Sequence, residues 1–205
     1  MACCVLLAKK QFRRLNMHRS QLRILLENYH PVDGDEKISK KKMLEFLEGV
    51  PNCFERGCKQ GHFTGSSWLL NKEGDKALLL LHGKFNEWLQ PGGHCDGDSD
   101  VFRVALREAQ EESGIMGIKP VSEAIFDIDV HRIPPYKNDP EHYHYDVRFL
   151  LQVQSDESLI KSSESHDLQW FDKDKEKLPN QVKEIARMFN KWVSRPCQTD
   201  AFVEY

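Results

Sequence analysis

Three glutamates on one predicted helix are the residues in this sequence that point most directly to chemistry. Glu108, Glu111 and Glu112 are spaced i, i+3 and i+4, which places their carboxylates on one helix face. Like charges at this spacing repel one another, and the helix dipole disfavours negative charge near the C-terminus. A divalent cation with oxygen ligands, such as Mg²⁺ or Mn²⁺, would relieve this conflict. The alternative is a solvated acidic face paired with Arg103 and Arg107.

The helix that carries the glutamates is predicted over residues 101–113. Its apolar stripe recurs at i, i+3, i+4 and i+7 and consists of Phe102, Ala105, Leu106 and Ala109. Asp98, Ser99 and Asp100 precede the helix as N-cap candidates. Gly114 suits the left-handed position that often follows a helix.

Residues 92–115 resemble the Nudix box, G-x5-E-x7-R-E-U-x-E-E-x-G-U, in which U is a bulky aliphatic residue. The positions that match in register are Gly93, Arg107, Glu108, Glu111, Glu112, Gly114 and Ile115. Ala109 is smaller than the usual aliphatic residue, and Ser99 stands where the family has its first glutamate. The segment W-L-Q-P-G-G and a predicted hairpin precede the box, so the resemblance covers roughly residues 61–193.

The resemblance implies divalent-metal-dependent hydrolysis of a phosphoanhydride bond in a nucleoside-diphosphate-linked small molecule. By position, Glu108, Glu111 and Glu112 would bind Mg²⁺ or Mn²⁺, and the backbone carbonyl of Gly92 is a further candidate ligand. Arg107 would orient a neighbouring glutamate, and Glu108 or Glu112 would double as the base that accepts a proton from water. Ser99 in place of the box glutamate is a departure from the family pattern, which Asp98 or Asp100 would have to compensate.

Another metal ligand in this family often comes from a loop before a strand that ends in an aromatic residue. Glu164 fits that description in the segment E-S-H-D-L-Q-W. His166 and Asp167 are competitors for the same role, and the alternative is that Glu164 is an ordinary loop residue.

The candidates for substrate contacts combine histidine, arginine and an aromatic residue: His94, His142, His144, Arg148 and Trp88. The even-numbered positions 142 to 148 share one face of a candidate strand and form a candidate phosphate-reading surface. The alternative is a polar outer face without a function. Trp88 would either stack on a base of the substrate or belong to the core. His94 would either contact a phosphate group or cap its loop.

The predicted elements around the box alternate in a pattern of strands, one helix, more strands and a terminal helix. Strands are expected at 66–70, 77–82, 124–131 and 144–153, a short one closes at 170–171, and an amphipathic helix covers 182–193. Together with the resemblance, this pattern predicts the α+β class: a Nudix-type α/β/α sandwich with a mixed sheet. A doubly wound parallel sheet would need a helix after nearly every strand.

The first sixty residues lie outside the resemblance. They predict a helical N-terminal extension at 1–60, followed by a Nudix hydrolase domain at 61–195 and a flexible tail at 196–205. A first helical pattern ends at His30-Pro31, and a second helix is expected to have Ser39 as its N-cap. These helices would either cover the active site or mediate homodimerisation, and the sequence does not distinguish between these two roles.

Composition narrows the class of protein. The chain has 205 residues, of which 30% are charged and 40% hydrophobic, and its net charge of −3 offers no basic field for nucleic acid. No apolar run approaches the roughly 20 residues that span a bilayer. The six cysteines show no disulfide framework, so we expect reduced thiols in a cytoplasmic protein whose partner is a small molecule.

Three alternatives remain open at this point. Cys53, Cys58 and His62 form a C-x4-C-x3-H string that could be half of a zinc site. Ser99 and the N-terminal helices also fit a non-catalytic Nudix-fold module that binds a nucleotide or a protein, although the retained glutamates argue against it. A metal-dependent isomerase on the same fold would need a cysteine–glutamate pair, for which Cys95 is a candidate.

Overall fold

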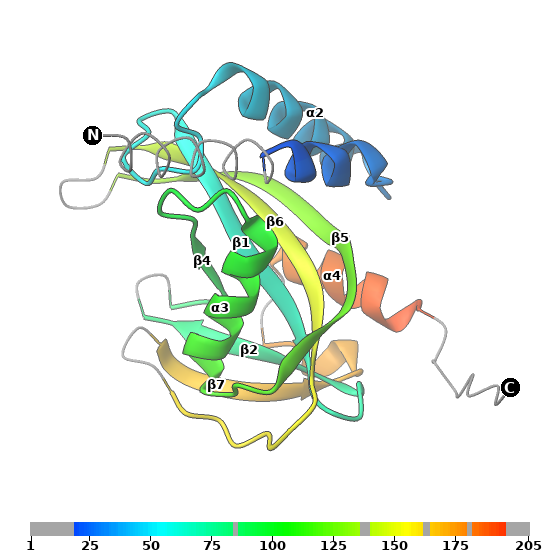
Figure 1. Ribbon diagram of the computed structural model, residues 1–205. Helices are drawn as coiled ribbons and strands as arrows, with labels where there is room; N and C mark the ends of the chain where they lie inside the picture. Colours follow the sequence, from blue (N-terminus) through cyan, green and yellow to red (C-terminus); the bar gives the residue numbers. More distant parts are fainter. Residues whose placement is uncertain (1–18, 84–85, 136–139, 162–164, 180–181, 196–205) are drawn as a thin grey trace, which may run out of the picture.

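The sheet at the centre of the protein is mixed. The computed structural model describes residues 19–83, 86–135, 140–161, 165–179 and 182–195 (Figure 1). Within these residues the strands are β1 (Gly61–Leu70), β2 (Lys76–His82), β3 (Trp88–Leu89), β4 (Gly92–His94), β5 (Ile118–Ile133), β6 (His142–Val153) and β7 (Ser165–Asp172). They follow the order β3-β2-β1-β6-β5, while β4 pairs with β1 and β7 pairs with β2. Only β1 and β6 pair in parallel within the described chain, which confirms the mixed sheet.

Helices cover both faces of this sheet. They comprise a helix at 19–28, α2 (Gly34–Gly49), α3 (Val101–Ser113), the short 3-10 helix η1 (Lys175–Lys177) and α4 (Lys183–Val193). Figure 1 shows α3 in front of the sheet and α4 behind it. The N-terminal helices share one apolar cluster with α3, and α4 packs in a second cluster. The predicted α+β class with an N-terminal helical part is therefore confirmed. No helix among the described residues is long and apolar enough to cross a membrane.

The central strand β1 is longer than the sequence pattern predicts. It begins at Gly61 rather than at Ser66, and all ten of its residues are buried. A strand covered on both faces lacks the alternation of apolar and polar residues that marks a half-exposed strand. Its hairpin with β2 is paired at Leu70 and Ala77, after which β1 pairs with β6 and β2 with β7.

The start of α2 corrects one prediction. The N-cap is Asp33, whose side chain accepts a hydrogen bond from the backbone N–H of Glu36 at 2.8 Å. Ser39 lies inside the helix and is buried. The helix therefore begins at Gly34, shortly after Pro31, because the carboxylate of Asp33 satisfies one of the unpaired N–H groups of its first turn.

The position of α3 against β1 depends on a glycine. Helix α3 has Asp100 as its N-cap and ends at Gly114, which has a φ of 76°. These boundaries agree with the sequence prediction. A Cβ atom on Gly65 would lie 2.6 Å from the carbonyl oxygen of Val101, so the absence of a side chain lets α3 approach the strand closely.

A buried ionic network joins the N-terminal helices to the sheet and to α4. The carboxylate of Asp127 pairs at 2.8 Å with Arg148, Arg187 and Lys191. Glu36 on α2 pairs with Arg187 at 3.2 Å and also contacts Lys191. Because isolated buried charges are strongly disfavoured, these pairs hold their elements in one arrangement. The predicted tail at 196–205 lies outside the described residues.

Candidate functional site

Two carboxylates of α3 lie at the glycine pair of β4. Glu112 Oε2 accepts a hydrogen bond from the backbone N–H of Gly92 at 2.8 Å, and the side chain of Glu112 is buried. The carboxylate of Glu108 lies against Gly93, where an added Cβ atom would be 2.5 Å from Oε2. Gly93 therefore leaves the space that the carboxylate of Glu108 occupies, whereas Gly92 binds Glu112 through its backbone N–H.

Arg107 connects the helix to the same strand. Its Nη2 donates to the carbonyl oxygen of His94 at 3.1 Å and to Glu108 Oε1 at 2.6 Å. The guanidinium therefore holds the carboxylate of Glu108 beside β4. Glu111, the third carboxylate of the cluster, is exposed.

The donor atoms at this place fit a divalent cation of the magnesium class. Glu108 and Glu112 supply carboxylate oxygens, and the backbone of Gly92 lies within reach of them. Mg²⁺ and Mn²⁺ prefer oxygen ligands of this kind.

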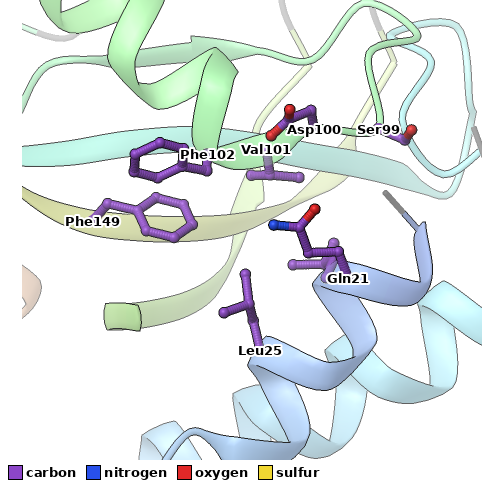
Figure 2. Close-up of a pocket in the computed structure, with 8 residues that line it drawn as sticks. Gln21, Leu25, Ser99, Asp100, Val101, Phe102 and Phe149 are labelled. Atoms are coloured by element: carbon purple, nitrogen blue, oxygen red, sulfur yellow. The ribbon is translucent and has the colours of Figure 1, made fainter. Parts of the chain in front are cut away.

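Ser99 occupies the start of α3, at the other end of the helix from Glu112. Ser99 is buried, with 3% of its surface exposed, and it lines a small pocket with Gln21, Leu25 and Phe149 (Figure 2). The neighbouring Asp98 pairs with Arg103 at 2.6 Å, and Asp100 caps the helix. These contacts tie both aspartates to the first turn of α3.

The predicted polar face of β6 has two different environments. His142 and His144 are half-buried, whereas Asp146 and Arg148 are buried. Asp146 accepts hydrogen bonds from Thr64 at 2.8 Å and from Arg148 Nε at 2.7 Å. The guanidinium of Arg148 is thus placed in the ionic network rather than on an open phosphate-reading surface.

The histidines gather at the open end of that face. The ring centroid of His144 lies 4.8 Å from that of His62, 5.2 Å from that of His94 and 5.6 Å from that of His131. Burial lowers the pKa of His62 to about 3, and the nearby histidines act in the same direction. Burial likewise holds the pKa of His144 below its usual range. Both rings are therefore neutral at pH 7.

The sequence predicts a different candidate site for His62. The string Cys53, Cys58 and His62 suggested half of a zinc site, but among the described residues the group with donor atoms close enough for a metal ion combines His62 with His142 and His144. Residue parity along β1 and β6 could have suggested this group only if their parallel pairing had been known. Burial raises the pKa of Cys53 to about 11, which keeps this thiol protonated.

Two of the remaining candidates lie in packed surroundings, and one lies outside the described residues. Trp88 is half-buried and packs edge-on against Phe171, with ring centroids 5.2 Å apart. Cys95 is buried, and burial raises the pKa of its thiol well above the usual range. A neutral, enclosed thiol gives no support to the isomerase alternative. Glu164 lies outside the described residues.

Comparisons with known proteins identify the family of this chain. The NUDIX domain family model matches residues 64–193. A relative from Lactococcus lactis subsp. cremoris (strain MG1363), named "Probable DHNTP pyrophosphohydrolase", is 31% identical over 127 residues, which cover 61% of this chain and 72% of the relative.

Two solved structures share the fold. An Ap4A hydrolase from C. elegans is 17% identical with a TM-score of 0.51, over 64% of this chain and 94% of that one. A NUDIX-family hydrolase from Clostridium perfringens is 24% identical with a TM-score of 0.51, over 64% of this chain and 96% of that one. At this identity the likeness concerns the fold alone.

Proposed function

This chain belongs to the Nudix hydrolase family and is a pyrophosphohydrolase of the Nudix type, and from this premise we propose the reaction in more detail. The proposed reaction is the divalent-metal-dependent hydrolysis of a phosphoanhydride bond in a nucleoside-diphosphate-linked small molecule. One observation carries this proposal, namely the carboxylates of Glu108 and Glu112 placed at the backbone of Gly92 and Gly93.

The charge of a pyrophosphate sets the requirement that the site must meet. A polyanion repels an attacking hydroxide, so positive charge has to be held beside the bond that breaks. We propose that Mg²⁺ or Mn²⁺ would be held by Glu108, Glu111, Glu112 and the carbonyl oxygen of Gly92. When bound, the ion would supply that positive charge and lower the pKa of a water molecule. The protein's own part is to keep these oxygens together, and the hydrogen bond from Gly92 to Glu112 does so for one of them.

The proton of the attacking water needs an acceptor on the protein. We assign this role to Glu112 or Glu108, because both carboxylates lie at the glycine pair. Arg107 is a positioning residue, since its guanidinium contacts the carboxylate of Glu108 and the backbone of His94.

The proposed substrate contacts lie on either side of the glycine pair in the chain. His94 follows the pair directly, and Trp88 precedes it on β3, which pairs with β2. We propose that His94 contacts a phosphate group of the substrate and that Trp88 stacks on its base. His144 lies next to His94 and His142 lies next to His144, while Arg148 contacts Asp146.

The printed names of the relatives define which substrates to test first. One relative is named as a DHNTP pyrophosphohydrolase and one structure as an Ap4A hydrolase, so triphosphates and dinucleoside polyphosphates belong in the panel beside nucleotide sugars. The full chain would be assayed with Mg²⁺, with Mn²⁺ and after chelation, with phosphate, pyrophosphate and nucleoside monophosphate as readouts.

A matched set of variants makes this assay decisive. Glu108→Gln and Glu112→Gln remove charge at the glycine pair, while Glu123→Gln removes an exposed charge on β5. We expect metal-dependent turnover in the wild type and in Glu123→Gln, and its loss in the other two variants. Turnover that survives chelation, or that survives both box substitutions, would contradict the proposal.

A further inference from the structure

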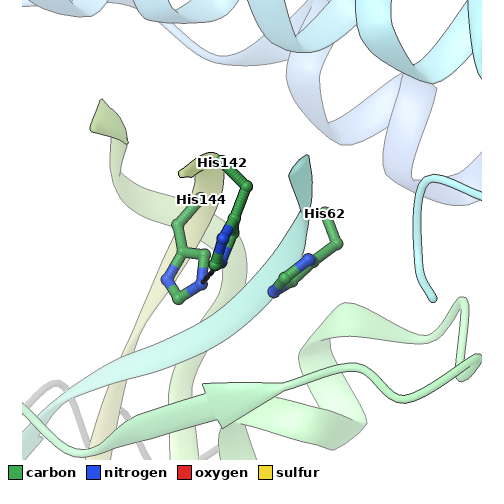
Figure 3. Close-up of side chains that lie close together, drawn as sticks. All are labelled: His62, His142 and His144. Carbon is green, nitrogen blue, oxygen red and sulfur yellow. Dashed lines mark hydrogen bonds between the residues drawn. The ribbon is translucent and has the colours of Figure 1, made fainter. Parts of the chain in front are cut away.

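Three histidines from two strands converge beside the glycine pair. Strands β1 and β6 pair in parallel with His62 opposite His144, and His142 lies two residues before His144 on the same face. Each ring offers one nitrogen such that these atoms all lie within 4.8 Å of one another. The shortest of these separations is 3.2 Å, between the Nε2 atoms of His142 and His144 (Figure 3).

His62 is buried without the hydrogen bonds that a buried imidazole normally makes. Its exposed fraction is 1%, and within the described residues neither ring nitrogen has a hydrogen-bond partner. A buried polar atom left without a partner destabilises the folded protein. A ligand of this nitrogen would remove that penalty, and Figure 3 shows the His62 ring directed toward the other two rings.

The hydrogen bonds of His142 show which of its nitrogens has a lone pair. Nδ1 of His142 lies 2.8 Å from the carbonyl oxygen of Pro140, which only accepts, so Nδ1 carries the proton. In the neutral ring Nε2 then has a lone pair, which accepts a hydrogen bond from Nε2 of His144, and a bound metal ion would replace that hydrogen bond. A backbone carbonyl that fixes the tautomer in this way is typical of histidines that bind metals.

We propose that His62, His142 and His144 bind a divalent transition-metal ion of the zinc class. Imidazole nitrogen suits Zn²⁺, Ni²⁺ and Cu²⁺, whereas carboxylate oxygen suits Mg²⁺. Zinc–nitrogen bonds of about 2.0–2.1 Å in a tetrahedral site imply nitrogen atoms about 3.4 Å apart. The separation between His142 and His144 is close to this value, and a nitrogen of His62 lies within 4.8 Å of the nitrogens that those two rings offer. Three protein ligands leave a fourth position for water or a substrate oxygen.

This site differs from the carboxylate site in its place and in its donors. Gly93 faces Glu108 on α3, whereas the next side chain, that of His94, has its ring centroid 5.0 Å from that of His62. Successive residues of a strand point to opposite sides, so β4 separates the two sets of ligands. The proposal therefore does not depend on the proposed hydrolysis.

The test measures zinc binding to the full chain in the presence of excess Mg²⁺. The chain would first be treated with a chelator and dialysed, then titrated with Zn²⁺ by calorimetry and with Co²⁺ by visible absorption. We expect one Zn²⁺ per chain, a tetrahedral Co²⁺ spectrum and a higher melting temperature with Zn²⁺. His142→Ala and His144→Ala should weaken this binding at least about 100-fold, since even loss of an outer-shell partner weakens metal sites 10–100-fold.

Two control variants separate this site from others. His30→Ala removes an exposed histidine outside the cluster, and Glu112→Gln weakens the carboxylate site. Both should keep the high-affinity Zn²⁺ ion and the Co²⁺ spectrum. The proposal is overturned if the wild type binds no Zn²⁺ in excess Mg²⁺, or if the ion is retained in the histidine variants. Circular dichroism of the metal-free variants checks that each is folded, and His142, which is half-buried, is the milder of the two changes.

Discussion

Glu112 Oε2 accepts a hydrogen bond of 2.8 Å from the backbone N–H of Gly92. This contact joins the last turn of α3 to β4 and fixes the direction of a carboxylate that would otherwise rotate. Orientation of this kind matters because general bases act only from within hydrogen-bond reach of the proton they accept. The glycine pair is therefore part of the proposed site.

Replacing Glu112 with glutamine tests the charge of this carboxylate apart from its position. The amide oxygen of glutamine can still accept the N–H of Gly92, so we expect a melting temperature close to that of the wild type. Loss of the charge and of the base should lower kcat/KM at least about 100-fold. Steady-state kinetics with Mg²⁺ would measure the effect, with Glu123→Gln as the exposed control.

Gly93→Ala tests whether the space beside β4 is required. The added Cβ atom would lie 2.5–2.7 Å from the two carboxylate oxygens of Glu108 and must displace them. A displacement of about 1 Å at a catalytic group can lower the rate about 100-fold. Gly57→Ala is the matched control, because nothing lies within 4 Å of a Cβ atom there. Equal kcat/KM values for the two variants would show that Glu108 does not need its present place.

Asp127→Asn tests the centre of the ionic network. The change leaves Arg148, Arg187 and Lys191 without the charge that each of them pairs with at 2.8 Å. Removing one partner of a buried ion pair costs about 3–5 kcal/mol in the free energy of unfolding. Urea denaturation at pH 7 would measure the loss. Asp172→Asn, at an exposed ion pair, should change stability by no more than about 0.5 kcal/mol.

The same aspartate predicts how stability depends on pH. Burial alone would raise the pKa of Asp127, but the hydrogen bond from Arg187 and the charges of Arg148 and Lys191 hold it well below its usual range. The unfolded chain, with an aspartate pKa of about 3.9, therefore binds this proton at a higher pH than the folded chain. The contribution of Asp127 to stability is complete above that pKa and is lost as the pH falls through 3.9 toward the native value. Urea denaturation at pH 7, 5, 4 and 3 should show this decline, and the decline should be shallower in Asp127→Asn.

A double-mutant cycle tests the attachment of α2 to α4. Glu36 on α2 is fully buried and contacts both Lys191 and Tyr29. Glu36→Gln and Lys191→Met should each destabilise the chain, and the double variant should lose less than the sum. We expect a coupling of about 0.5–3 kcal/mol from urea denaturation. Strict additivity would mean that the N-terminal helices are held without this pair, and Glu45→Gln on the exposed side of α2 is the control.

The sequence alone determined helix α3 and the relation of its glutamates. The helical period, the cap and the terminal glycine depend on residues within a few positions of one another, so Val101–Ser113 and the shared face of Glu108 and Glu112 follow from local rules. The family resemblance depended on the same fixed spacing. Even locally, the predicted N-cap of α2 was wrong, because Asp33 caps the helix and Ser39 lies inside it.

The tertiary structure alone decided which distant residues meet. The parallel pairing of β1 with β6 places His62 opposite His144, and the pairing of β5 with β6 places Asp127 opposite Arg148. Neither register is encoded in a local period, because it depends on which strands become neighbours across a long stretch of chain. Because of the same pairing, Arg148, which was predicted to bind phosphate, is the partner of the buried Asp127. Local spacing therefore specified the carboxylates, whereas long-range strand pairing created the histidine cluster and the ionic network.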